Sequence, residues 1–231
     1  MATETAPNNG QKRAPKPMSA PKRVYLIAYN ALNAALWSVV LGRTVATLYT
    51  RGLDAGPASV YPAVGEWTKW TQTLAALEIV HSLLGVVRAP LLTTLMQVSS
   101  RFALVWGAVH LYPSVAASPA YSSMLLAWST TEVVRYLFFA LSLSGCEPAF
   151  LQWFRYSGFY VLYPVGISSE LWELFLASTA ARGEGDMAKF VAFVVIMATY
   201  LPGAPKLYGH MMRQRRKVLG GGGGAAAKKM Q

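Results

Sequence analysis

Residues 25–49 read YLIAYNALNAALWSVVLGRTVATLY, a continuous run in which Arg43 is the one charged side chain. A helix needs about 20 predominantly apolar residues to cross the hydrocarbon core of a bilayer. The run therefore predicts a membrane-spanning helix. The whole chain agrees with this, because 54% of its 231 residues are hydrophobic and 13% are charged, which is too apolar for a soluble surface.

Further apolar segments of this kind follow along the chain, near residues 70–87, 91–112, 121–144, 149–178 and 187–208. Turn-forming residues separate them, at residues 52–62, 88–90, 113–119, 145–148 and 182–186. The second and third segments are joined by almost nothing and are expected to form a tight antiparallel hairpin. We therefore predict an all-α polytopic membrane protein, a bundle of six transmembrane helices.

Lysine and arginine residues predict the orientation of this bundle, because the cytoplasmic flanks of membrane proteins carry an excess of them. The chain has 21 in all. Arg101 and Arg135 fall within predicted spans, and one side of the bundle holds only Arg43, Arg51, Lys69, Arg182 and Lys189. All the others lie on the side that also holds both ends of the chain. Both termini are therefore expected to be cytosolic.

The two ends of the chain differ in composition from the region between them. Residues 1–23 are polar, Pro-rich and basic, which predicts a disordered cytosolic arm and no cleaved signal. Residues 210–231 form a basic, Gly/Ala-rich tail that is expected to be a flexible tether. Its lysines Lys228 and Lys229 stand four and three residues from the end, the arrangement of a dilysine signal for retrieval to the endoplasmic reticulum. Residues 24–209 are then the six-helix domain that must hold any chemistry.

Composition also argues against two kinds of ligand. The one cysteine, Cys146, and the three histidines, His81, His110 and His210, offer few ligands, so no metal site is expected. The net charge of +11 collects at the ends and in short loops rather than on one polar face, so no nucleic acid is expected as a partner. Nothing in the sequence calls for a cofactor.

Several ionisable residues nevertheless fall inside the predicted spans, where each costs about 2.5–3.5 kcal/mol at mid-bilayer. Glu132 and Arg135 are three residues apart and can form an architectural ion pair on one helical face. Glu78 and His81 have the same spacing, and Arg101 could complete a network with Glu78 or Glu132. The tryptophans are expected to pack or to lie at the membrane interface: Trp37, Trp67, Trp70, Trp106 and Trp128.

The fifth segment contains FYVLYPVGISSELWELF at residues 159–175. Tyr163 and Glu170 stand seven residues apart, two helical turns, so they face the same way about 10 Å apart along the axis. Pro164 removes a backbone donor and is expected to bend the helix beside them. A phenol and a carboxyl on one face can act as an acid–base pair. The alternative is a packing helix in which Glu170 merely pairs with Arg101 or Arg135.

Several blocks of the chain resemble the 3-hydroxyacyl-CoA dehydratases of very-long-chain fatty-acid elongation, also named protein-tyrosine-phosphatase-like proteins. The resemblance spans approximately residues 25–217. It rests on YNALNAALW at 29–37, QTLAALEIVHSLLGVVRAPLLTTLMQVSSR at 72–101, WSTTEVVRYLFF at 128–139 and FYVLYPVGISSE at 159–170. It implies that Tyr163 and Glu170 are the catalytic pair. It also implies residence in the endoplasmic-reticulum membrane and partnership with the condensing enzyme and the reductases of the elongation cycle.

The implied reaction eliminates water from a very-long-chain (3R)-3-hydroxyacyl-CoA to give the trans-2-enoyl-CoA, which makes the chain a lyase. One group must take the C2 proton and another must protonate the leaving hydroxyl. We assign Glu170 as the base and Tyr163 as the acid, although the residues leave the reverse assignment open. A third group should polarise the thioester oxygen, and the candidates by residue type are Gln97, Arg101 and Arg135.

Basic residues at the cytosolic mouth could bind the phosphates of coenzyme A, and Arg88, Arg155 and Lys206 are placed to do so. They could equally be ordinary residues of the positively charged cytosolic side.

Other functions can be weighed against the residues. A cysteine phosphatase needs the pattern His-Cys-x5-Arg, but Gly145 precedes Cys146 and Gln152 stands where the arginine should be. An inactive membrane scaffold or a small transporter is the remaining alternative. Transporters often contain two similar halves, and no such repeat is visible here.

Overall fold

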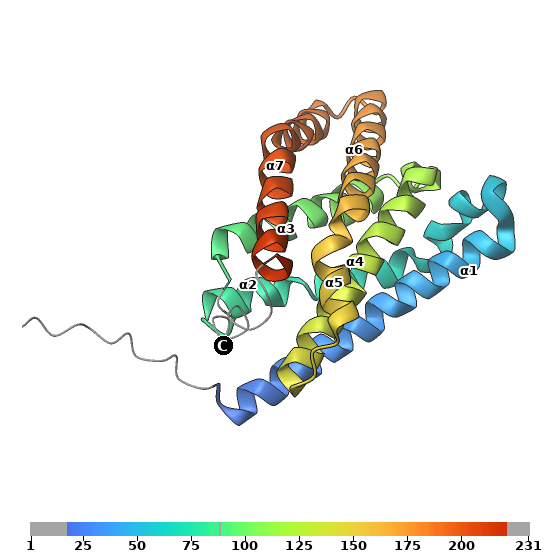
Figure 1. The fold of residues 1–231 in the computed structure, drawn as a ribbon. Helices are drawn as coiled ribbons and strands as arrows, with labels where there is room; N and C mark the ends of the chain where they lie inside the picture. The colour runs from blue at the N-terminus through green and yellow to red at the C-terminus, as the bar shows by residue number, and fades with distance from the viewer. Residues whose placement is uncertain (1–17, 88, 221–231) are drawn as a thin grey trace, which may run out of the picture.

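The computed structural model describes residues 18–87 and 89–220, and its regular elements in these ranges are all helical (Figure 1). This confirms the predicted all-α class. In chain order the elements are α1 (Ala20–Thr73), α2 (Ala76–Leu83), α3 (Leu91–Phe102), the π-helix η1 (Ala103–Val109), the short 3-10 helix η2 (Val115–Ala117), α4 (Pro119–Ser144), α5 (Ala149–Ser157), α6 (Phe159–Gly183) and α7 (Met187–Leu219).

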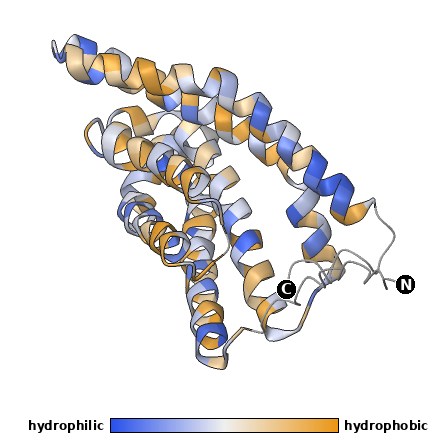
Figure 2. Cartoon of the chain, turned by 90° about the vertical axis from the view of Figure 1, so that its left-hand side faces the viewer, coloured by the Kyte–Doolittle hydropathy of each residue, from blue (hydrophilic) through white to orange (hydrophobic). Residues whose placement is uncertain are grey.

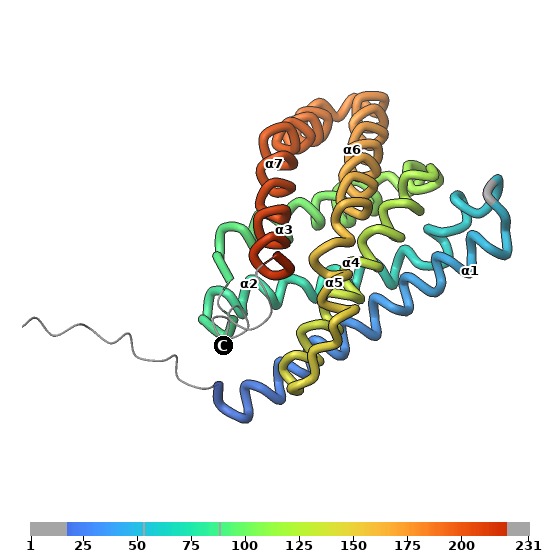
Figure 3. The backbone as a smooth tube through the Cα atoms, viewed as in Figure 1, coloured from blue at the N-terminus to red at the C-terminus, as the bar shows by residue number. Residues whose placement is uncertain are grey.

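α1 consists of two helical arms joined at Gly52, where the chain turns back on itself (Figure 3). Gly52 has a φ of 71°, a conformation that glycine adopts without a steric penalty. The arms pack closely, since a Cβ at Gly56 would lie 3.2 Å from the Cα of Leu48. The predicted turn over residues 52–62 is therefore wrong in length. The returning arm stays helical through Pro57 and Pro62, because the burial of its side chains in the core, among them Val60 and Val64, outweighs the backbone hydrogen bonds that the prolines remove.

The chain reverses direction near Gly52 and again between α2 and α3, between η1 and α4, between α4 and α5, and between α6 and α7 (Figure 1). Lys22 Nζ donates to the Gly85 carbonyl at 3.4 Å, and Arg23 Nε donates to the Leu143 carbonyl at 2.5 Å. These bonds bring the start of α1, the α2–α3 connection and the end of α4 together. We call this end of the molecule the basic end.

The reversals divide the chain into successive helical passes. Three of these passes are long and apolar enough to cross a membrane: Ala20–Gly52, Pro119–Ser144 and Met187–Leu219. In the described residues three helices, not the six predicted, meet this criterion of length and composition. The second pass is interrupted between Thr73 and Ala76, and α2 is only eight residues long. The fifth pass is divided at Gly158, and α6 carries two glutamates among its apolar residues.

The outer surface has the character expected of a membrane protein. Large apolar side chains point outward from several helices, and Leu32, Leu92 and Leu201 are 54%, 70% and 79% exposed. Figure 2 shows hydrophobic residues along the lengths of the helices and a hydrophilic stretch where α1 begins. Exposed apolar area of this extent is rare on soluble monomers.

α4 is the central helix and packs against α1, α5 and α6. The largest buried side chains, among them Trp37, Tyr121 and Leu174, join α1, α4 and α6 into one core. α6 is covered on another side by α7. The predicted catalytic helix therefore lies between α4 and α7.

The boundaries of the terminal regions shift relative to those expected from composition. α1 begins at Ala20 and α7 continues to Leu219, so parts of the expected arm and tail are helical. Residues 1–17 and 221–231 lie outside the described residues, and with them the proposed retrieval signal at Lys228 and Lys229.

Candidate active site on α6

The helix that carries Tyr163 and Glu170 is α6, which stays continuous through Pro164. Six residues earlier, α5 and α6 meet at Gly158, a single residue between the two helices whose φ of −59° and ψ of −25° are still helical. Pro164 interrupts little because the carbonyl it leaves without a helical partner is that of Tyr160, in the first turn of α6. The helix is therefore not interrupted at Pro164.

Glu170 is held by two neutral donors from neighbouring helices. Trp128 Nε1, on α4, donates to Glu170 Oε1 at 2.8 Å, and the Tyr200 hydroxyl, on α7, donates to Oε2 at 2.7 Å. Glu170 forms no ion pair among the described residues. The alternative in which Glu170 simply pairs with Arg101 or Arg135 is therefore not what the structure contains.

Tyr163 also faces α7, and its hydroxyl donates to the Ala204 carbonyl at 3.1 Å. Ala204 and Tyr200 are four residues apart on α7, about 6 Å along its axis. The phenol of Tyr163 and the carboxylate of Glu170 thus contact α7 about one turn apart. No hydrogen bond joins the two groups to each other in the described residues.

A second polar cluster lies beside this pair, and its members are ion-paired. Glu132 is buried, with Arg101 bound to one carboxylate oxygen and Arg135 Nε bound to the other at 2.7 Å. Arg135 also donates to Glu78 at 2.7 Å, and the Tyr136 hydroxyl donates to Glu78 at 2.6 Å. The predicted Glu132–Arg135 pair is confirmed, and Arg101 joins it through Glu132.

Glu78 and His81 do not pair with each other, so their suggested interaction is wrong. His81 Nε2 instead lies 2.7 Å from the Tyr25 hydroxyl, and the imidazole is buried. The three-residue spacing allowed the pair, but the carboxylate of Glu78 instead accepts hydrogen bonds from Arg135 and Tyr136 on α4. His81 is thus a hydrogen-bonded histidine of the interior.

Trp128 connects the two clusters. The guanidinium of Arg101 lies 4.8 Å from the centroid of the Trp128 ring, whose N–H donates to Glu170. Gln97 stands four residues before Arg101 on α3 and is exposed. Arg135 is held between Glu132 and Glu78, further from Glu170 along the network. Of the residues considered for polarising a thioester, Arg101 is therefore the one tied to the Glu170 site.

The residues expected at a phosphate-binding mouth are less well placed. Arg155 stacks its guanidinium against the rings of Phe138, Phe139 and Tyr156, at 5.0, 4.4 and 5.6 Å, so it faces α4. Arg88 lies outside the described residues. Lys206 is exposed on α7.

The sequence analysis did not predict a role at the site for two residues, Trp128 and Tyr200, which both contact Glu170. Trp128 was expected only to pack, and its place at the start of the block WSTTEVVRYLFF was the available signal. Tyr200 lies 30 residues beyond Glu170 and carries no local signal, because only the antiparallel packing of α6 and α7 brings the two together.

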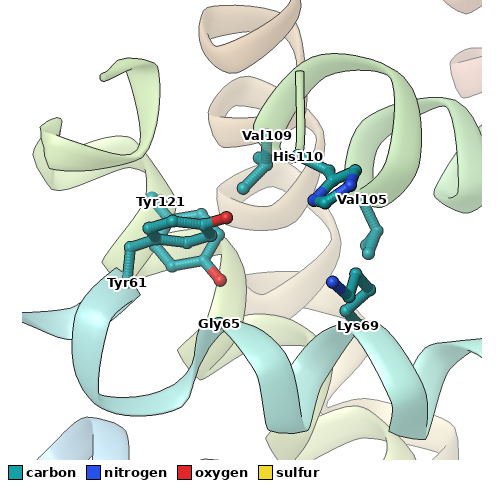
Figure 4. A pocket seen from close by; sticks show the side chains of 7 residues that line it. All are labelled: Tyr61, Gly65, Lys69, Val105, Val109, His110 and Tyr121. Carbon is teal, nitrogen blue, oxygen red and sulfur yellow. The ribbon is translucent and has the colours of Figure 1, made fainter. Parts of the chain in front are cut away.

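A small cavity of about 10 Å³ lies elsewhere in the molecule, between the returning arm of α1, η1 and α4 (Figure 4). Tyr61 and Tyr121 line one side of it and His110 and Lys69 the other. Lys69 Nζ is bound to Glu66 at 2.6 Å. The volume suits a single water, so this cavity is not the place for a long substrate. No group of three or more His, Cys, Asp or Glu residues in the described ranges could hold a metal.

The sequence is similar to a well-defined set of proteins. The model of the family described as "Protein tyrosine phosphatase-like protein, PTPLA" matches residues 72–221. A protein of Caenorhabditis elegans named very-long-chain (3R)-3-hydroxyacyl-CoA dehydratase hpo-8 is 42% identical over 84% of this chain and 93% of its own length.

Two further relatives carry the same activity in their names. The Arabidopsis thaliana protein named very-long-chain (3R)-3-hydroxyacyl-CoA dehydratase PASTICCINO 2 is 36% identical over 86% of this chain and 94% of its own length. The dog protein named very-long-chain (3R)-3-hydroxyacyl-CoA dehydratase 1 is 34% identical over 92% of each chain. No solved structure matches the chain.

Proposed function

The chain belongs to the protein tyrosine phosphatase-like family, and we propose on that premise that it is a very-long-chain (3R)-3-hydroxyacyl-CoA dehydratase. It is a hydro-lyase that eliminates water from a 3-hydroxyacyl-CoA to give the trans-2-enoyl-CoA, the third step of fatty-acid elongation. The relatives that carry this name align over most of their length and most of this chain. The observation in the structure that supports the proposal best is that α6 presents to α7 both a phenol, Tyr163, and a carboxylate without an ion-pair partner in the described residues, Glu170.

Glu170 is the base of this reaction. Both of its carboxylate oxygens accept hydrogen bonds, from Trp128 and Tyr200, and these two donors hold the carboxylate in position. It takes the proton from C2 of the substrate. The electrons of that C–H bond form the C2–C3 double bond, and the C3–O bond breaks.

Tyr163 is the acid that protonates the departing hydroxyl, which leaves as water. Its hydroxyl already donates a hydrogen bond, to the Ala204 carbonyl, and a 3-hydroxyl in place of that carbonyl would receive the same proton. After release of water and product, solvent returns a proton to Tyr163 and takes one from Glu170, so the enzyme is unchanged. No cofactor enters this balance.

Negative charge builds on the thioester oxygen as the C2 proton leaves, and a cation nearby lowers the barrier. Arg101 fits this role because it lies over Trp128 while Glu132 holds one of its terminal nitrogens. Gln97, four residues away on α3, can assist at the same face. Arg135 is assigned instead to the architecture of the bundle.

The membrane setting belongs to the same proposal. We infer that the chain crosses the endoplasmic-reticulum membrane six times with both termini in the cytosol, which the five chain reversals and the charge bias support. A glycosylation site inserted near Arg182 should be modified in microsomes, and terminal tags should be accessible to protease. A glycosylated N-terminal tag would refute this orientation. The condensing enzyme and the reductases of the cycle are the expected partners.

The decisive assay uses the purified full-length protein with a 3-hydroxyacyl-CoA and follows formation of the 2-enoyl-CoA. A scaffold or transporter would show no turnover, and either would tolerate Tyr163→Phe because the ring still packs. Absence of the enoyl product in an otherwise folded preparation would overturn the proposed function.

A further inference from the structure

Aromatic side chains follow the contact between α6 and the second half of α7, from the basic end toward Glu170. Tyr208 lies at the middle of this row, with ring centroids 5.5 Å from Phe159, 6.3 Å from Tyr160 and 5.8 Å from Tyr163. The row leads directly to the Tyr163 hydroxyl and, one turn of α7 further, to Tyr200 and Glu170. We call it the aromatic seam.

An arginine stands at the outer end of the aromatic seam. Arg215 Nε donates to the Ser157 hydroxyl at 3.0 Å, and its guanidinium lies 5.5 Å from the centroid of the Tyr160 ring. These two contacts hold the side chain in place and engage one of its five donors. The terminal nitrogens have no hydrogen-bond or ion-pair partner among the described residues. Arg215 is itself partly exposed, and Tyr160 beside it is 43% exposed.

This free guanidinium differs from the other arginines that face the bundle. Arg101 and Arg135 are occupied by carboxylates, and Arg155 is stacked among aromatic rings on the side of α4. A positioned guanidinium with two free terminal nitrogens matches the geometry of a phosphate group, which it can bind through two parallel hydrogen bonds.

The distance from this arginine to the catalytic pair can be measured along the helix. Ser157 and Glu170 are thirteen residues apart, and the backbone at Gly158 between them is itself helical, with φ −59° and ψ −25°. Thirteen residues of helix rise about 20 Å. In coenzyme A thioesters the pantetheine arm places about thirteen bonds between the diphosphate and the sulfur, roughly 15 Å when extended at about 3.5 Å per three bonds. The two bonds from sulfur to C2 and the reach of the Arg215 side chain account for the remainder.

We propose that Arg215, positioned by Ser157 and Tyr160, binds the diphosphate of the acyl-CoA substrate, and that the pantetheine arm lies along the aromatic seam to deliver the thioester to Glu170. This inference rests on the proposed dehydratase function. It replaces Arg155, suggested by the sequence, as the phosphate-binding residue.

The test compares two substrates that carry the same 3-hydroxyacyl group, one on coenzyme A and one on N-acetylcysteamine, which lacks the diphosphate. Arg215→Gln should raise KM for the CoA substrate by about ten- to a hundredfold, the range for hydrogen bonds to a charged group, and leave kcat unchanged. It should leave both constants for the truncated substrate unchanged. Arg215→Lys keeps the positive charge but loses the two parallel N–H donors of the guanidinium. Its KM for the CoA substrate should therefore lie between the values of the unaltered protein and of Arg215→Gln.

Arg216→Gln is the matched control, because it removes the same charge from the next residue, which is exposed on α7. Equal increases in KM for the two variants would mean that general charge attraction, rather than a site at Arg215, holds the substrate. A loss of kcat on both substrates would assign Arg215 a structural role. Either result overturns the inference, as does an unchanged KM.

Failure of the dehydratase assignment itself would be recognised separately, as absence of turnover of either substrate by the unaltered protein. Equilibrium binding of free coenzyme A then still tests whether Arg215 binds the diphosphate. The unaltered protein and Arg216→Gln should bind it alike and Arg215→Gln about ten- to a hundredfold more weakly. Equal affinities in all three would refute the Arg215 site whatever the reaction is.

Discussion

Glu132 on α4 and Glu170 on α6 are two carboxylates in the interior of one bundle, and their surroundings are opposite. Glu132 is contacted by two arginines, Arg101 and Arg135, one at each oxygen. Glu170 is contacted by an indole N–H and a phenol, both neutral. The charge of Glu132 is compensated by its neighbours, whereas that of Glu170 is only solvated by them.

The difference separates architecture from chemistry. A carboxylate between two guanidinium groups is a poor base, because accepting a proton would leave Arg101 without a counterion and Arg135 with Glu78 alone. A carboxylate held by neutral donors can accept a proton without stranding a charge. The two regions meet at Trp128, which stacks with Arg101 and donates to Glu170. The ion-paired region can therefore orient the reactive one without taking part in proton transfer.

The largest effect is expected at the neutral site. Tyr163→Phe removes only a hydroxyl and Glu170→Gln only a charge, so both proteins should insert and accumulate normally. General acid–base groups contribute about 10²–10⁴-fold, and each variant should lose kcat on that scale with KM changed far less. Steady-state formation of the 2-enoyl-CoA measures this.

The double variant Tyr163→Phe/Glu170→Gln sharpens that result. Because the two groups act in one elimination, it should be barely slower than the slower single variant. Near-normal turnover in both single variants would place the active site elsewhere.

At the ion-paired site the loss should fall on stability. Glu132→Gln leaves Arg101 and Arg135 facing each other without their shared counterion, and breaking a buried ion pair in this way costs about 3–5 kcal/mol. Protein yield and thermal stability in detergent should drop. Exchanging Glu132 and Arg135 should restore little, since the exchange puts an arginine against Arg101. Normal yield combined with lost turnover would move Glu132 into the active site and remove the contrast between the two regions.

Tyr200→Phe deletes one of the two hydrogen bonds to Glu170 and keeps the ring. A hydrogen bond to a charged group contributes about 1.5–3 kcal/mol, so kcat should fall by about ten- to a hundredfold while KM stays near its original value. Tyr112→Phe is the matched control, because that hydroxyl is buried without a hydrogen-bond partner among the described residues. If the two variants behave alike, Tyr200 does not position the base.

The sequence predicted relations within a helix better than relations between helices. The seven-residue spacing of Tyr163 and Glu170 and the three-residue spacing of Glu132 and Arg135 are properties of helical periodicity. The ion pair was confirmed, while the catalytic role of the other two remains a prediction.

Partners on other helices depend on packing that no local pattern encodes. Two hydrogen bonds are of this kind, the one from Tyr200 to Glu170 and the one from Arg135 to Glu78. The extended turn expected near Gly52 was wrong for a related reason. Two prolines predicted a loop, but burial of that stretch in the core keeps it helical.

The smallest effect is expected at a third buried carboxylate, Glu173, three residues beyond Glu170 on the same helix. Glu173 is fully buried, with one oxygen accepting from the Ser118 hydroxyl and the other without a partner in the described structure. It therefore also lacks a counterion, so absence of a cation alone does not distinguish it from Glu170.

Position distinguishes these two glutamates. Glu173 accepts from Ser118, at the start of α4, and Glu170 accepts from Trp128, ten residues further along, about 15 Å along a helix. In the described residues Glu173 has no hydrogen bond from α7 like the one that Tyr200 donates to Glu170. Glu173→Gln keeps the shape and the acceptor for Ser118, so turnover should stay within about threefold of the unaltered protein, the range of a fraction of a kcal/mol. The same assay used for Glu170→Gln makes the comparison. A loss at Glu173 as large as that at Glu170 would show that the base is defined by burial on α6 rather than by the neutral donors from α4 and α7.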